Sequence, residues 1–372
     1  MSEKAQVQIE EPEGQDSSQS SGWGDYPLDS VFVRTESRTV REVVSRIKKG
    51  RYILDPDYQR DFVWELEKQS RLIESCLMRI PLPVFYVAEA KDGKIMVVDG
   101  LQRLTTFYRY TNDKFVLTWP VPEEDKNARK VFLIGKKFSD LPLKLQERIE
   151  DVQLILYILD EKAPERVKLD IFERVNGGVP LTRQQMRNCL HNGQATQWLK
   201  KTAQSEIFLR VTDGRLDTKS MRDREVINRF CAFYLLGPEE YKGDMDGFLA
   251  QALDKMNGMG ADELNQLTLA FDRSMQSNER LFDKHAFRKS LATGNKGADR
   301  TMINIAFFDI CSAELARLSR ERVEEKADDL RSVISNLLNN KDFSNAITFA
   351  TNGAKQVKLR FDMMQKAIAE VA

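Results

Sequence analysis

The sequence predicts an α+β protein in which a mixed N-terminal domain precedes a helical domain. Between residues 30 and 190, apolar β-branched and aromatic runs such as "PVFYVAEA" and "VQLILYILD" alternate with amphipathic helical patterns. Beyond residue 190 the strand signals fade, and helical segments are separated by breaks such as "GDMDG" and "NGMGAD". This segregation of strands and helices along the chain is typical of α+β architecture.

Length and composition predict the domain boundaries. The 372 residues fit about two domains. Residues 1–22 are acidic and rich in Ser and Gln, with too few apolar side chains to offset the entropy of ordering. We therefore expect a disordered acidic tail over residues 1–22 that folding does not require, an α+β domain over residues 23–190 and a helical domain over residues 191–372.

The first elements of the α+β domain carry clear start and stop signals. Thr39 and Glu42 form a capping box at the start of the helical pattern "TVREVVSRIKKG", and Gly50 follows its end. The segment "ELEKQSRLIESCLMRI" repeats apolar residues on one helical face. The Asp92-Gly93 pair between "PVFYVAEA" and "KIMVVDG" predicts a β-hairpin, and the helical pattern "LQRLTTFYRYTND" follows it directly.

The later elements of this domain are predicted in the same way. "FSDLPLKLQERIED" indicates a helix, and "VQLILYILD" indicates a buried strand. "PERVKLDIFERVNGG" has Pro164 near its start and Gly177-Gly178 at its end, as expected for a helix. Thr182 with Gln185 makes a second capping box, which opens "LTRQQMRNCLHNG".

Composition excludes several classes of protein. With 57 basic and 57 acidic residues, the chain is not a globally basic nucleic-acid binder, although a local basic surface remains possible. Its two histidines are too few for most zinc hydrolases and His-Asn-His nucleases. Its four well-separated cysteines suit a reducing compartment. The sequence has no apolar run of membrane-spanning length and no signal-peptide core, so we expect a cytoplasmic protein without a membrane partner.

The stretch "VVDGLQRLTTF" places an acid, an amide and a guanidinium at one predicted strand-to-helix corner. Gly100 would let a ligand approach the backbone, where the first N–H groups of the helix attract anions. Arg103 offers a donor fork for phosphate, and Asp99 could bind a divalent cation or position a water. Gln102 could orient a water or read the edge of a base. The alternative is an ordinary Asp-Gly turn in which Arg103 is solvated or forms a structural ion pair.

Two further polar motifs accompany this corner. Gln59-Arg60 stands among aromatic residues in "DPDYQRDFVW", as a second phosphate ligand or as an ion-paired Arg between core aromatics. In "FERVNGGVPLT", Arg174 and Asn176 lie at a predicted helix end, and Asn176 with its glycines also suits an ordinary C-cap. The chain has neither a Walker A motif nor a Gly-x-Gly-x-x-Gly motif, so a P-loop ATPase or a Rossmann dehydrogenase is unsupported.

In this order, the motifs "DPDYQRDFVW", "VVDGLQRLTTF" and "FERVNGGVPLTRQQMRN" resemble the N-terminal domain of GmrSD-type (type IV) restriction proteins. The resemblance covers about residues 30–190 and implies a fold similar to ParB and sulfiredoxin-like domains. That family's Asp-Gly-Gln-Gln-Arg motif is associated with nucleotide binding and hydrolysis in bacterial defence against foreign DNA.

The resemblance implies a site for a nucleoside triphosphate with Mg²⁺. It assigns catalysis to Asp99, Gln102 and Arg103, with Asp99 also as the metal ligand. The nucleotide-binding residues that it implies are Gln59, Arg60, Gly100, Arg103, Arg174 and Asn176. Two departures matter: Leu101 replaces the first Gln of the motif, and nothing in the chain resembles the family's His-Asn-His nuclease module.

Three hypotheses follow. The first is an NTP-hydrolysing defence protein that acts with DNA and a separate nuclease or effector protein. The second is a non-catalytic module that binds nucleotide, DNA or a partner, and the third is a ParB-like DNA-nicking enzyme. In each case we expect the helical half to supply partner or DNA contacts, with Arg222, Arg224 and Arg229 recurring at helical intervals.

Overall fold

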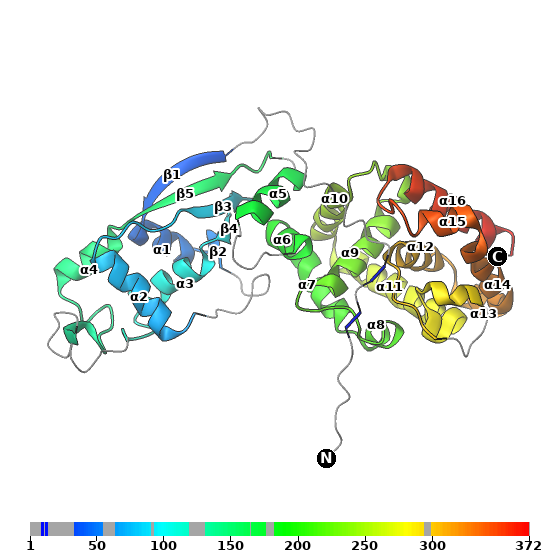
Figure 1. Ribbon diagram of the computed structural model, residues 1–372, viewed down its shortest axis with the longest axis horizontal. Coiled ribbons are helices and arrows are strands. Elements are labelled where there is room, and N and C mark those ends of the chain that lie inside the picture. The colour runs from blue at the N-terminus through cyan, green and yellow to red at the C-terminus, as the bar shows by residue number, and fades with distance from the viewer. Residues whose placement is uncertain are drawn as a thin grey trace, which may run out of the picture. The chain divides into compact units, whose positions relative to one another are not determined.

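A computed structural model describes the chain over residues 9–10, 12–13, 33–54, 64–90, 93–118, 131–163, 165–175, 182–293 and 299–371. The chain divides into two compact units, which are coloured along the chain in Figure 1. We call Tyr26–Leu190 the α+β unit, and His191–Ala372 together with Met1–Asp25 the helical unit. The predicted α+β class is confirmed.

A mixed five-stranded sheet forms the centre of the α+β unit, in the order β1-β5-β3-β4-β2. Its strands are β1 (Val33–Thr39), β2 (Tyr52–Ile53), β3 (Phe85–Glu89), β4 (Ile95–Asp99) and β5 (Gln153–Leu159). Strand β3 runs antiparallel to β4 and parallel to β5, so β4 ends at the sheet edge where β3 and β5 begin. The predicted hairpin between β3 and β4 is confirmed: Gly93 turns the chain with a positive φ of 73°, and Asp92 lies outside the described residues.

The α+β unit has six helices among the described residues, and the first and the last begin where their capping signals predict. They are α1 (Val40–Lys48), α2 (Leu66–Leu77), α3 (Leu101–Thr111), α4 (Leu143–Glu150), α5 (Glu165–Val175) and α6 (Arg183–Leu190), with a short 3₁₀ turn η3 (Val131–Leu133). The Thr39 hydroxyl accepts from the Glu42 N–H at 3.2 Å. Thr182 and Gln185 form the predicted reciprocal capping box, with bonds of 3.2 and 2.8 Å.

The sheet separates two apolar cores. Val87 and Val97 face a large cluster that includes the apolar residues of α1 to α4. Met96 and Val98 face the opposite side, where α5 and α6 supply Phe172 and Met186. Because successive residues of a strand point to opposite faces, β4 is buried on both sides. Its carboxyl end, at Asp99, is therefore held by packing on both faces of the sheet.

The helical unit is built around one completely buried helix. Its helices are α7 (Gln194–Ala203), α8 (Glu206–Val211), α9 (Arg222–Leu235), α10 (Met245–Asn257), α11 (Ala261–Phe282), α12 (Ile305–Leu315), α13 (Arg320–Glu325), α14 (Ala327–Asn339), α15 (Lys341–Ala346) and α16 (Ala354–Ala369), with 3₁₀ turns η4 (Pro238–Glu240), η5 (Asp283–His285) and η6 (Lys289–Thr293). Every residue of α12 is buried, and α9, α11 and α16 pack against it.

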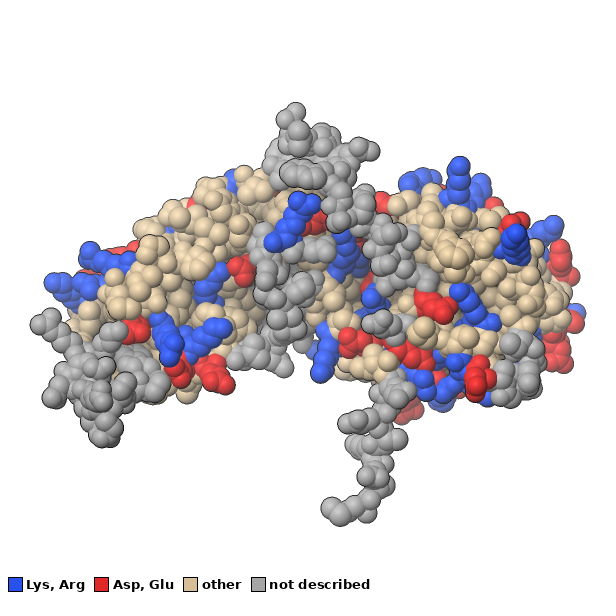
Figure 2. All heavy atoms as spheres, viewed as in Figure 1, with Lys and Arg blue, Asp and Glu red and all other residues tan. Residues whose placement is uncertain are grey.

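No helix in the described part of the chain combines the length and the apolarity needed to span a membrane. Acidic and basic side chains are interspersed on the face of the helical unit that Figure 2 shows.

A buried ionic cluster joins three helices of this unit. Arg229 of α9 donates two hydrogen bonds to the carboxylate of Asp309 on α12, at 2.8 and 2.6 Å. Arg360 of α16 donates to the same carboxylate at 3.1 Å, and all three side chains are essentially inaccessible to solvent. Burial lowers the pKa of Arg360 to about 10, and the Asp309 carboxylate opposes that shift. The expectation that Arg229 contacts partners or DNA is therefore wrong, because its guanidinium lies in the core.

Part of the acidic tail is bound to the helical unit. Glu10 donates its backbone N–H to the Arg215 carbonyl at 2.9 Å. Glu13 pairs with the chain before α12: its N–H donates to the Ile303 carbonyl, and its carbonyl accepts from the Ile305 N–H, both at 2.8 Å. At these two glutamates the expectation of a disordered tail is wrong, because composition does not reveal contacts with distant residues.

We expect Asp309→Asn to lower the free energy of unfolding by about 3–5 kcal/mol, because it leaves two buried guanidinium groups without a counter-charge. Glu279→Gln is the matched control, since Glu279 pairs with Arg210 between α8 and α11 at exposed positions. It should cost less than about 1 kcal/mol. Urea unfolding of both variants measures the difference. Similar losses in both would show that the buried cluster does not stabilise the unit.

Candidate functional site

The corner between β4 and α3 is formed by Asp99, Gly100 and Leu101. Asp99 ends the strand, Gly100 is the helix N-cap and Leu101 is the first helical residue. Gly100 has a φ of +101°, and a methyl group on its α-carbon would overlap the Phe85 ring. Glycine is therefore required here both for backbone conformation and for space. The first N–H groups of α3, which have no partners within the helix, lie at this corner.

Arg103 connects the corner to the beginning of β3. Its Nη1 donates to the Pro83 carbonyl, and its Nη2 donates to the Val84 carbonyl at 3.1 Å and to Asp99 Oδ2 at 2.8 Å. The guanidinium also lies over the Phe85 ring, with its carbon 4.2 Å from the ring centroid. One side chain thus links the chain entering β3, the end of β4 and the first turn of α3.

The electrostatics of Arg103 follow from its burial. Only 9% of the residue is exposed. Burial lowers the pKa of the guanidinium, and the Asp99 carboxylate opposes that shift; arginine nevertheless remains charged at neutral pH. The sequence left Arg103 as a phosphate ligand, a solvated side chain or part of a structural ion pair. The contacts with Asp99 and the two carbonyls favour the structural ion pair. A direct contact between Arg103 and phosphate stays a prediction.

Asp99 is the accessible charged group of the corner. Its side chain is 40% exposed, and only Oδ2 is engaged by Arg103. Within the described part of the chain, Oδ1 has no hydrogen-bond partner. The same residues contain no group of three or more acidic, His or Cys side chains that could hold a metal ion. A cation at Asp99 would therefore take its other ligands from water and substrate, as Mg²⁺ commonly does.

Gln102 holds the polypeptide that enters α2. Its Oε1 accepts from the Trp64 N–H at 3.3 Å, while Gln69 Nε2 donates to the Trp64 carbonyl at 2.7 Å. The backbone of Trp64 is therefore held by hydrogen bonds with side chains of α2 and α3. It directly follows residues 55–63, which contain Gln59-Arg60 and lie outside the described residues. Sequence reasoning assigned Gln102 to a water and missed this contact, because nothing local pairs positions 38 residues apart.

The third motif is carried by the opposite face of the sheet. Arg174 lies exposed in the last turn of α5, and Asn176 lies outside the described residues. Their placement at the nucleotide stays a prediction. In α6, which packs on β4, Gln184 donates to Asn188 at 2.8 Å and accepts from Arg187 at 2.5 Å, and all three residues are buried.

This buried polar cluster of α6 was not assigned a role from the sequence. The i, i+3, i+4 spacing of Gln184, Arg187 and Asn188 places them on one helical face. That spacing, in a helix expected to pack on a sheet, is the signal that could have identified them. Of the predicted site residues, the structure brings together Asp99, Gly100, Gln102 and Arg103.

We expect Gly100→Ala to destabilise the α+β unit by about 3 kcal/mol, from backbone strain plus overlap with Phe85. Gly93→Ala is the matched control, since Gly93 also has a positive φ but its methyl group would meet open space. It should cost only about 1 kcal/mol. Chemical unfolding of the two variants tests the difference, and equal losses would contradict the close packing of the corner.

We expect Gln102→Ala to speed hydrogen exchange of the Trp64 amide by roughly 5- to 10-fold, corresponding to about 1 kcal/mol for one lost hydrogen bond. Gln102→Glu keeps an acceptor for the same N–H and should retain protection. Residue-resolved exchange compares the two variants with the wild type. Unchanged protection in Gln102→Ala would show that this bond does not hold the Trp64 backbone.

Residues 40–192 match the family model described as GmrSD restriction endonuclease, N-terminal domain. No curated protein matches the chain. The matched region extends from the start of α1 past the end of α6, so it contains the corner and all three motifs, and it leaves residues 193–372 outside. The match relates the chain to restriction and defence proteins. The α+β unit therefore belongs to the family of GmrSD N-terminal domains.

Proposed function

We propose that the α+β unit binds a nucleoside triphosphate with Mg²⁺ at Asp99 and hydrolyses it, as part of bacterial defence against foreign DNA. One observation carries the proposal: the partly exposed Asp99 carboxylate is fixed at the N-terminus of α3 by the buried Arg103. The GmrSD family match supports the defence role, because the family is named for a restriction endonuclease.

The charges at the corner favour a metal–phosphate ligand over a phosphate alone. The N-terminus of α3 attracts anions through its free N–H groups and its dipole. The Asp99 carboxylate would repel the same anion unless a cation lay between them. Mg²⁺ satisfies both demands, since it binds one or two carboxylates together with phosphate oxygens and water. The exposed Oδ1 of Asp99 is the natural ligand atom.

Arg103 acts in this proposal as a positioning residue. It holds one oxygen of Asp99 and orients the other toward solvent. Gln102 has a similar indirect role, because it holds the backbone of Trp64, the residue that follows the sequence segment with Gln59 and Arg60. Arg60 would supply the cation that neutralises phosphate, which makes electrostatic stabilisation the source of catalysis.

DNA cleavage, in this proposal, belongs to a separate nuclease or effector protein. The two histidines have different partners within the helical unit: His191 Nδ1 lies 2.7 Å from Asp254 Oδ1, and His285 Nδ1 lies 2.9 Å from Ser290 Oγ. This dispersal does not suit His-Asn-His chemistry, which needs imidazole at one metal site.

We expect Asp99→Asn to reduce Mg²⁺-dependent phosphate release by about 100-fold or more, while nucleotide binding falls much less. The amide keeps the size of the side chain and a hydrogen-bond acceptor for Arg103, but it is a poor metal ligand. Glu161→Gln, which removes an exposed carboxylate from the same unit, should keep wild-type turnover. Phosphate release with each NTP, with and without DNA, together with calorimetric titration, measures both quantities.

Wild-type turnover in Asp99→Asn would contradict the proposal. Nucleotide binding without phosphate release by the wild-type chain would instead support the alternative of a non-catalytic nucleotide-binding module.

A further inference from the structure

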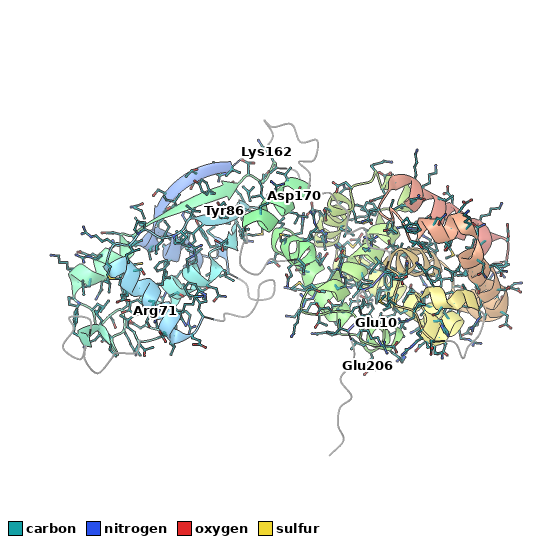
Figure 3. The ribbon with its side chains drawn as sticks, viewed as in Figure 1. Glu10, Arg71, Tyr86, Lys162, Asp170 and Glu206 are labelled. Atoms are coloured by element: carbon teal, nitrogen blue, oxygen red, sulfur yellow. The ribbon has the colours of Figure 1, made fainter. Side chains whose placement is uncertain are left out.

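Two glutamates of the N-terminal segment lie against a cluster of cationic side chains on the helical unit. We call this cluster, with the backbone that flanks it, the tail site. It consists of the side chains of Arg215, Arg288 and Lys289 and the backbone of Ile303 and Ile305. Glu10, which Figure 3 labels among the helices of this unit, lies at its centre.

The Glu10 carboxylate is engaged on both oxygens. Oε1 lies 2.6 Å from Arg215 Nη1, and Oε2 lies 2.7 Å from Nη1 of Arg288, whose side chain is fully buried. The Ile303 N–H also donates to Oε2, at 3.4 Å. Burial raises the pKa of Glu10, but the hydrogen bonds and charges of Arg288 and Arg215 outweigh it and hold the pKa below its usual value. The carboxylate is therefore bound in its ionised form.

The segment is also recognised through its backbone. Glu13 forms a parallel bridge with Asn304, using both its N–H and its carbonyl, and the Glu10 N–H donates to the Arg215 carbonyl. The Glu13 side chain reaches Lys289 at 3.1 Å. Extended peptides are commonly recognised in this way, with main-chain hydrogen bonds for affinity and side-chain contacts at fixed positions for specificity.

The charge of the tail site depends on the segment. Asp213 pairs with two arginines. Its Oδ2 lies 3.4 Å from Arg288 Nη2 and also contacts Arg300 Nη1. If Glu10 and Glu13 were removed, Asp213 would be the one carboxylate among the described residues that still pairs with a cation of this region. A buried guanidinium is expensive unless its charge is compensated, so the site favours an acidic occupant.

We propose that the tail site recognises an extended segment that carries two glutamates three residues apart. The chain's own N-terminal segment occupies this site and can be released from it, and we call this segment the strap. Ion pairs rather than apolar burial hold the segment in the tail site, because the side chains of Arg215, Lys289 and Glu13 remain partly exposed. This reconciles a tail composition that favours disorder with ordered contacts at two of its glutamates, Glu10 and Glu13. The inference concerns the helical unit and does not depend on the nucleotide proposal.

A peptide-binding experiment on the full chain tests this inference. The double variant Glu10→Gln/Glu13→Gln should release the strap, and circular dichroism checks that it remains folded. A fluorescein-labelled peptide of residues 6–16 is then titrated, and anisotropy reports binding. We expect saturable binding to the double variant and at least tenfold weaker binding to the wild type, in which the site is already filled.

Two controls separate recognition from simple charge attraction. The variant Glu3→Gln/Glu11→Gln removes the same charge from the tail and should bind the peptide as weakly as the wild type does. A peptide carrying Gln at positions 10 and 13 should bind none of the three proteins. Absence of peptide binding to the double variant, or equal binding to all three proteins, would overturn the proposal.

Discussion

The Arg103 guanidinium lies between the chain that enters β3, the end of β4 and the first turn of α3, and its bonds to Pro83, Val84 and Asp99 hold these three segments together. Because both faces of β4 are packed, the corner cannot relax without disturbing the sheet. The consequence is a carboxylate with one oxygen fixed and one exposed, which suits binding of a cation more than a freely rotating side chain would.

Much of this corner could be predicted from local sequence. An acid and an arginine four residues apart across a strand-to-helix junction come close in space, and Gly100 between them indicates the left-handed turn. The bonds from Arg103 to Pro83 and Val84 could not be predicted, because they join residues that become neighbours only when the hairpin forms. The N-cap contacts of Thr39 and Thr182 were predictable for the converse reason: both partners lie within one turn.

The errors in the helical unit have a common physical cause. Arg229 recurs at helical spacing with other basic residues, but its carboxylate partner, Asp309, lies 80 positions away in sequence, so periodicity could not reveal that it is buried. Glu10 is likewise paired with Arg288, 278 positions away. In both cases a charge in the interior is held by a distant opposite charge. Composition counts residues, and periodicity relates only residues that are close in sequence. Neither identifies pairs that are far apart in the chain.

Paramagnetic relaxation by Mn²⁺ shows directly whether a cation binds beside Asp99. With Mn²⁺ in place of Mg²⁺ and a non-hydrolysable NTP analogue, the amide resonances of Gly100 and Leu101 should broaden strongly, because the proposed metal ligand, Asp99, directly precedes them in the chain. The same resonances should stay sharp in Asp99→Asn under identical conditions. Broadening confined to other parts of the chain, or broadening of this corner that persists without the Asp99 carboxylate, would show that Asp99 does not bind the metal.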